Sequence, residues 1–358
     1  MDNRTRIRRT ILGEPVDRPP FFFFFPPWPE TIRRWRREGL PVDVPWDAGF
    51  GFDAGFTRVP VNIGFYPPFT AEVLEEKGDT YIYRDELGVI KEGRKDDASV
   101  PIYRQHPVTD PRDWERLKSE RLNPDDQGRF PADLAAVSAA LNGGPAAVLV
   151  GDFPYGLFGT CRELLGVENF LVSFHTQPGL IADMMDYLTS FWLRLYARIL
   201  MHFRLDAIHI WEDMSGKTGS LISPAMIRRF MLPNYRRITA FAREHDIPVV
   251  SVDTDGDCRE LIPLFIEGGI NLVFPFEVAA GCDILAYRRL YPGLGIMGGI
   301  DKRAVARGPE AIDRELERIS PMFVHGRYIA ALDHLVPPDI SWDHFCYFVH
   351  RLREIIFA

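Results

Sequence analysis

The sequence lacks the features of membrane, nucleic-acid-binding and disulfide-rich proteins. Its 358 residues contain no apolar run of the roughly 18 residues that a membrane-spanning helix needs, and residues 1–20 lack the apolar segment of a secretory signal. A formal net charge of −8 argues against a general nucleic-acid binder, which needs a basic face. The four cysteines are scattered without a CxxC pair, so we expect a reduced, cytoplasmic protein.

The Gly-rich phosphate loops of nucleotide-binding folds are also absent, since neither GxGxxG nor GxxxxGK[ST] occurs. What the chain has instead is a regular alternation of short apolar runs with longer amphipathic segments. Runs rich in Val, Ile and Leu are typical of buried parallel strands. They cover residues 146–153, 207–213, 248–256, 271–277, 294–301 and 328–334, and "PPFFFFF" at 19–25 is a plausible first strand.

This alternation predicts an α/β fold, a single (β/α)₈ TIM barrel formed by one domain over residues 1–358. Residues 40–110 are rich in Pro, Gly and aromatic residues, and we interpret them as an insertion that covers the barrel mouth like a lid. A doubly wound open sheet is the alternative fold, although it usually carries a Gly-rich loop. Among the helical segments, the one over 223–245 has Ser223 as its expected N-cap, and Pro233 is expected to kink it.

Acidic residues follow the predicted strands. In a barrel the carboxyl ends of all strands meet at one rim, where barrel enzymes keep their active sites. The alternative is that each acid caps the helix that follows it. The residues concerned are Asp152, Glu212 with Asp213, Asp253 with Asp255, Glu277, Asp301, and Asp333 with His334.

Asp253 and Asp255 are the most informative of these acids, because residues two apart on a strand face the same side. Together with His334 they predict a divalent metal site, with zinc most favoured and manganese or iron as alternatives. A calcium loop does not fit, since the Gly and Glu that such a loop requires are not in place. His209 is interpreted as a packed core histidine, and strand alternation places Glu212 with its even-numbered neighbours rather than with His209.

Residues 298–303, "GGIDKR", indicate a second binding element. Gly298 and Gly299 allow a ligand or a neighbouring backbone to approach closely. Lys302 could receive an anionic group, so we take these three residues as candidates for cofactor binding. The alternative is that the basic residues simply begin a helix.

Several segments together resemble the uroporphyrinogen decarboxylase superfamily. They read "RIRRTILGEPVDRPPF", "FPYGLFGTCRELLGVENFL", "EDMSGKTGSLISPAMIRRFMLPNYRRI", "GGIDKR" and "DHLVPPDISWDHFCYF". The resemblance covers nearly the whole chain and implies one barrel with its site at the carboxyl rim. It also implies one of two chemistries: metal-free decarboxylation of a porphyrinogen, or zinc-dependent methyl transfer involving a corrinoid or a thiol.

The sequence departs from both branches of this family. The Arg-Gln-Ala-Gly-Arg-Tyr signature of the decarboxylases is absent, and Asp53 lies only roughly where their central aspartate stands. The methyltransferases bind zinc through a His-x-Cys pair and a late Cys. Here the corresponding positions look like Asp253-x-Asp255 and His334, so hard ligands replace soft ones.

The first functional hypothesis is therefore a metal-dependent methyltransferase or demethylase that moves a methyl group between a small substrate and a corrinoid or thiol. Glu212 and Asp301 are its acid–base candidates. The chain has no corrinoid-binding Asp-x-His-x-x-Gly element, so a corrinoid would be carried by a partner protein. A second copy of the chain, in a homodimer, is a further candidate partner.

Two alternatives remain open. One is a metal-free lyase acting on a tetrapyrrole or a small carboxylate, in which Asp53 would stabilise a developing cation. The other is a barrel that binds a ligand without catalysis. Fold alone does not decide among these three.

Overall fold

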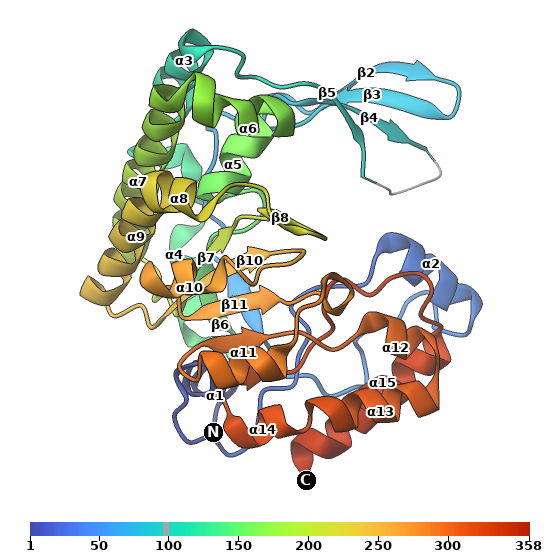
Figure 1. Cartoon of the computed structure of the whole chain (residues 1–358). Helices are drawn as coiled ribbons and strands as arrows, with labels where there is room; N and C mark the ends of the chain where they lie inside the picture. Colours follow the sequence, from blue (N-terminus) through green and yellow to red (C-terminus); the bar gives the residue numbers. More distant parts are fainter. Residues whose placement is uncertain (96–99) are drawn as a thin grey trace.

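A curled parallel sheet of seven strands lies at the centre of the computed structural model, which describes residues 1–95 and 100–358 (Figure 1). Its strands, in spatial order, are β1 (Phe56–Arg58), β6 (Ala147–Val150), β7 (Ala207–Trp211), β10 (Val249–Thr254), β11 (Leu272–Pro275), β12 (Gly295–Met297) and β13 (Tyr328–Ile329). Every neighbouring pair is parallel. The prediction of a parallel sheet is confirmed, and six of these strands lie within the predicted apolar runs.

The eight-stranded closure expected of the barrel is not confirmed. In the described part of the chain, residues 19–25 form no strand, and β1 and β13 stand at the two ends of the sheet. The segment instead runs between them: Phe21 O accepts a hydrogen bond from Asp53 N at 2.7 Å, and Pro27 forms an isolated bridge with Val336. Prolines flank the five phenylalanines, and a residue without an N–H cannot complete a hydrogen-bonded ladder.

Alternation along the strands divides the core in two. One cluster inside the curl contains Ala147, Leu149, Val249 and Leu272, and α1 (Asn3–Leu12) contributes Ile7 and Ile11 to it. The other cluster lies between the sheet and the surrounding helices and includes side chains at the intervening strand positions. Odd-numbered residues of β7 and β10 therefore face inward. The same parity determines which side chains at the carboxyl ends of these strands point inward.

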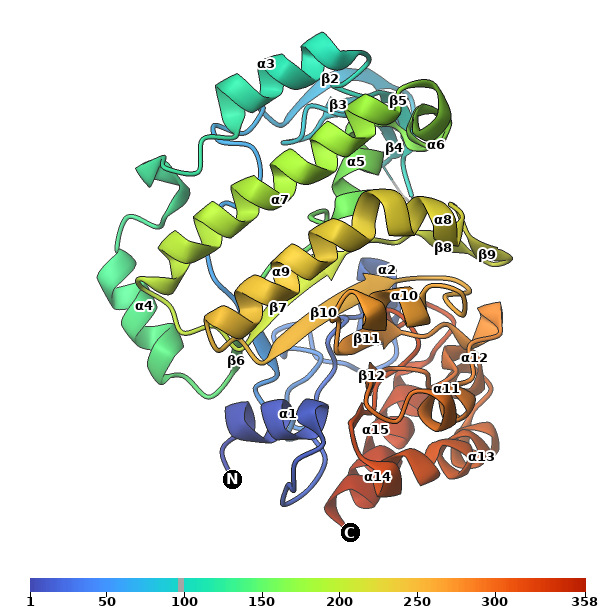
Figure 2. The ribbon, with the colours of Figure 1, turned by 60° about the vertical axis from the view of Figure 1, so that its left-hand side comes forward.

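Helices cover the outside of the sheet, and α7 (Pro178–Leu200) and α9 (Leu232–Glu244) lie side by side in both views (Figure 2). The remaining α-helices are α2 (Pro29–Arg37), α3 (Pro111–Arg121), α4 (Leu134–Gly143), α5 (Leu157–Leu165), α6 (Val167–Thr176), α8 (Pro224–Met226), α10 (Ile262–Glu267), α11 (Ile284–Leu290), α12 (Lys302–Ala306), α13 (Pro309–Ile319), α14 (Pro321–His325) and α15 (Trp342–Phe357). Short 3₁₀ turns occur at η1 (Gln127–Arg129) and η3 (Val278–Ala280). Within the described residues, no helix is both long and apolar enough to cross a bilayer.

The segment over 223–245 is helical, as predicted, and Ser223 caps it by accepting a hydrogen bond from Met226 N. A π-helical segment, η2 (Ile227–Met231), interrupts it just before Pro233. The irregularity thus lies one turn before the proline, where its missing N–H and its ring disturb the hydrogen bonds of the preceding turn.

Residues 40–110 include β1 of the main sheet and also an antiparallel sheet of four strands. Its strands are β2 (Glu72–Lys77), β3 (Thr80–Arg84), β4 (Ile90–Arg94) and β5 (Ile102–Gln105), and it projects from the body of the protein (Figure 1). A small hairpin, β8 (Ser215–Gly216) with β9 (Gly219–Ser220), follows β7. Tyr103 and His106 line a cavity together with Asp213, so the antiparallel sheet reaches the carboxyl side of the main sheet.

Candidate active site

A cavity of about 360 Å³ opens at the carboxyl ends of β1, β6, β7 and β10. Residues of these strands and of two loops line it: Phe24, Phe25, Pro26, Arg58, Asp152, Phe153, His209, Trp211, Asp253, Asp255, His334 and Leu335. Strand register explains part of this set, because Ser251 lies beside His209 and Asp253 beside Trp211. Their side chains share the inward parity of the core, so the last inward positions of β7 and β10 reach the cavity.

Asp253 is the most buried acid of the cavity, with 6% of its surface exposed. Its carboxylate has no hydrogen bond or ion pair with any residue that the structure describes. Burial raises the pKa of Asp253 well above its usual range, and the nearby carboxylates of Asp255, Asp213 and Asp152 raise it further. Burial and the neighbouring carboxylates therefore favour the protonated form of Asp253, and its carboxyl group lines the cavity.

Asp255 and His334 form a second acid–base unit. His334 Nε2 lies 3.1 Å from Asp255 Oδ2, and the imidazole stacks on Phe25 with ring centroids 5.7 Å apart. Burial alone would lower the pKa of His334, but the hydrogen bond and charge of Asp255 outweigh it and the pKa is raised. The charged imidazolium is thus favoured by its partner across the cavity.

Arg58 brings a fixed positive charge to the cavity. Its Nε lies 2.5 Å from Asp152 Oδ2, and its guanidinium lies over the Phe24 ring at 5.4 Å. His209 stacks on Phe274, and its Nδ1 is 3.1 Å from Ser251 Oγ. Burial, helped by Arg58, lowers the pKa of His209 to about 3, so this histidine is neutral. It is packed as the sequence suggested, although it also forms part of the cavity wall.

The structure brings together the three residues predicted as metal ligands, but it does not arrange them as a ligand set. Asp253, Asp255 and His334 line the same cavity. Nevertheless, within residues 1–95 and 100–358 no group of three or more His, Cys, Asp or Glu side chains is placed to hold a metal ion. The side chains as they stand do not fit the expected zinc site, and the chemistry derived below uses the protein's own groups.

Glu212 lies outside the cavity. It is fully buried, and its carboxylate accepts hydrogen bonds from the N–H groups of Leu157, Phe158 and Gly159 at 3.2, 2.6 and 3.2 Å and from Tyr235 OH at 2.7 Å. Burial raises the pKa of Glu212 to about 7. The predicted acid–base residue is therefore placed as the acceptor for the first turn of α5.

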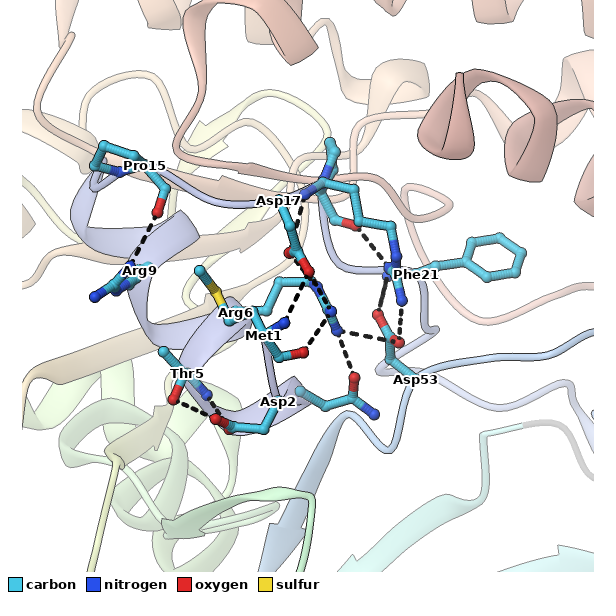
Figure 3. A network of polar contacts seen from close by, with 12 residues as sticks. Met1, Asp2, Thr5, Arg6, Arg9, Pro15, Asp17, Phe21 and Asp53 are labelled. Carbon is cyan, nitrogen blue, oxygen red and sulfur yellow. Dashed lines mark hydrogen bonds and ion pairs between the residues drawn. The ribbon is translucent and has the colours of Figure 1, made fainter.

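Asp53 is also engaged elsewhere. Its carboxylate receives two hydrogen bonds from Arg18, at 2.8 and 2.7 Å, and one from Phe21 N at 2.9 Å. Arg6 Nη1 approaches it at 3.5 Å and links it to Asp17 (Figure 3). Asp53 thus ties α1 to the segment that passes through Phe21, and it does not line the cavity of Asp253.

The residues of "GGIDKR" likewise form contacts within the protein. Asp301 caps α12 through Arg303 N and pairs with the Arg303 side chain at 2.9 Å. Lys302 Nζ lies 3.1 Å from Glu277 Oε1. Gly298 and Gly299 have φ of 98° and 75°, and their N–H groups bond to the neighbouring strands. Close backbone approach therefore accounts for the two glycines.

Sequence reasoning missed Arg58, Phe24, Phe25 and Trp211 as cavity residues. Arg58 ends a three-residue strand inside the expected insertion, so no apolar run marked it. The two phenylalanines belong to the expected first strand, and the stretch of five gave no indication of which rings face the cavity. Trp211 could have been found, because it shares the parity of Asp253 on adjoining strands.

Comparison with known proteins agrees with this fold and with the resemblance seen in the sequence. Residues 85–355 match the family described as "Uroporphyrinogen decarboxylase (URO-D)". The uroporphyrinogen decarboxylase of Syntrophotalea carbinolica is 24% identical over 293 residues, which cover 75% of this chain and 82% of that protein. That of Rhodococcus erythropolis is 30% identical over 121 residues, only 32% of this chain and 30% of the relative. A solved structure described as a methyltransferase from Methanosarcina mazei has the same fold, with a TM-score of 0.64 and 16% identity over 99% of both chains. This chain belongs to the uroporphyrinogen decarboxylase family.

Proposed function

We propose that this protein removes a methyl group from a small substrate and that Asp253 protonates the atom from which the methyl group leaves. The single observation that carries the proposal is the buried, unpartnered carboxyl of Asp253 in the cavity. When a methyl–oxygen bond breaks, its electron pair goes to the oxygen, and a neighbouring acid stabilises the leaving group by giving it a proton. A carboxyl whose pKa is raised by burial is suited to this role.

The volume of the cavity limits the size of the substrate. About 360 Å³ is near the lower end of the roughly 300–1,000 Å³ that small-molecule pockets occupy. The cavity therefore suits a compact substrate against Phe25 and Trp211 rather than a tetrapyrrole. The methyl acceptor, a thiol or a corrinoid on a partner protein, would approach from the open side and supply the electron pair for the new bond to carbon.

Methyl release from compact methyl ethers tests this proposal, with reduced cobalamin or a small thiol as acceptor and the methylated acceptor as the product measured. We expect Asp253→Asn to lower kcat by about 10²–10⁴-fold, the usual contribution of a general acid. Glu212→Gln is the matched control, because Glu212 is an equally buried acid that faces α5 instead of the cavity. Undiminished turnover by Asp253→Asn would rule out the assigned role.

Arg58 favours a second candidate, decarboxylation of a small carboxylate. Its side chain is 45% exposed, and an incoming carboxylate can take the place of Asp152 beside it. After CO₂ leaves, the Asp253 proton would be transferred to the carbanion. Release of CO₂ without methylation of an acceptor would favour this reaction, and binding without either product would favour a non-catalytic barrel.

A further inference from the structure

We propose that Cys258 and Cys282 form a reversible disulfide next to the active-site cavity. The two Sγ atoms are 3.8 Å apart, and the residues are 0% and 3% exposed. A disulfide needs about 2.05 Å between sulfurs, so small rotations of both side chains would close the bond. This inference does not depend on which reaction the cavity catalyses.

The pair connects two loops that follow neighbouring strands. Cys258 follows β10 three residues after Asp255, and Cys282 lies just after η3, beyond the end of β11. The loop after β11 holds Gly256 through two contacts: the Gly256 N–H donates to Glu277 Oε2 at 3.0 Å, and its carbonyl accepts from Cys282 Sγ at 3.3 Å. The thiol of Cys282 is therefore part of what holds the peptide next to Asp255.

A cavity of about 320 Å³ lies against both loops and is lined by Asp255, Gly256, Ala279 and Ala280. Neither cysteine lines it, so an oxidant entering here would reach the thiols only by passing between the two loops. The hydrogen bond with Cys258 lowers the pKa of the Cys282 thiol, whereas Cys258 itself has a raised pKa. Cys282 is also the less buried of the two, at 3% against 0% exposed, so we assign it as the nucleophile and Cys258 as the thiol that resolves the intermediate.

The reaction needs a hydroperoxide as oxidant. The Cys282 thiolate attacks the peroxide oxygen, which breaks the O–O bond, gives a sulfenic acid and releases an alcohol or water. Cys258 then attacks the Cys282 sulfur, the S–S bond forms as the S–O bond breaks, and one water leaves. Two thiols are oxidised by two electrons, the peroxide is reduced by two, and a dithiol reductant reverses the change.

Closing this bond changes the support of Asp255. Cys282 loses the proton with which it donates to Gly256 O, and the two loops are pulled together. Because Asp255 immediately precedes Gly256 and faces His334, the disulfide would alter the contact between Asp255 and His334.

Thiol mapping of the full-length protein after treatment with hydrogen peroxide tests the proposal. We expect two of the four thiols to disappear, with a mass loss of about 2 Da on a peptide that joins Cys258 to Cys282, and dithiothreitol to restore them. In Cys258→Ser, dimedone should trap a sulfenic acid at Cys282. Cys346→Ser, which removes a half-exposed thiol on α15, should form the disulfide like the natural chain.

One result would overturn the inference, namely that Cys258 and Cys282 stay reduced while Cys346 is oxidised. The natural chain alone can give this result, even where Cys258→Ser does not fold.

Discussion

His334 Nε2 and Asp255 Oδ2 are 3.1 Å apart, although 79 residues separate them in the chain. This contact joins the loop after β10 to the loop after β13 across the cavity. The imidazole also stacks on Phe25, so the aromatic segment near the start of the chain helps to orient it.

The first prediction concerns the charge of this histidine. We expect His334 to titrate above its ordinary value of 6.5, and the pair to stabilise the fold fully below that value and to lose its contribution as pH rises through the raised pKa. In Asp255→Asn the pKa should fall below 6.5, because burial then acts without the carboxylate. NMR of the imidazole protons measures both values. Asp257→Asn is the control, since Asp257 pairs with Arg259.

The second prediction is that Asp253 lowers stability at neutral pH. The folded pKa of Asp253 lies well above the unfolded value of 3.8, so its unfavourable contribution appears as pH rises from 3.8 toward the folded pKa. We expect Asp253→Asn to stabilise the protein by about 0.5–2 kcal/mol at pH 7, as relief of a strained functional site commonly does. Denaturant unfolding at several pH values measures this. An equal gain at pH 3 would contradict an origin in charge.

The third prediction is that Glu212 stabilises the fold and does not take part in the chemistry of the cavity. Glu212→Gln replaces one acceptor oxygen by an NH₂ group that faces backbone N–H groups or Tyr235 OH. We expect a loss of about 1–3 kcal/mol in the free energy of unfolding, the cost of buried groups left without partners. Urea unfolding provides the measurement, and Glu267→Gln on the surface is the control. An unchanged stability with lost turnover would return Glu212 to the catalytic candidates.

The fourth prediction concerns metal content. Because the described side chains form no group of three or more metal donors, we expect less than one equivalent of zinc, manganese or iron in protein purified without chelator. Elemental analysis of the natural chain beside Asp255→Ala/His334→Ala decides this. One full equivalent that disappears in the double variant would show that the three side chains rearrange around a metal.

Strand alternation accounts for what the sequence could predict. It located six strands and placed Asp253 and Asp255 on one inward face, where the cavity lies. The same parity puts Glu212 on the side of Ile208 and Ile210, which pack toward the helices. The sequence pattern therefore already indicated that Glu212 faces away from the cavity. What the sequence could not show was how side chains from distant segments meet. Arg58 and Phe25 enter the cavity through a short strand and an irregular segment that no periodicity marks.

The bridge between Pro27 and Val336 has a consequence for the order in which the protein folds. Thr31 Oγ1 donates to Val336 O at 2.8 Å, a contact between residues 305 positions apart. Phe25 and His334 adjoin this junction, so their side of the cavity forms only after residue 336 has been synthesised. Contacts of such long sequence separation form slowly. During synthesis the parallel sheet can assemble strand by strand while the cavity still lacks a wall, and binding competence would mark the last step of folding.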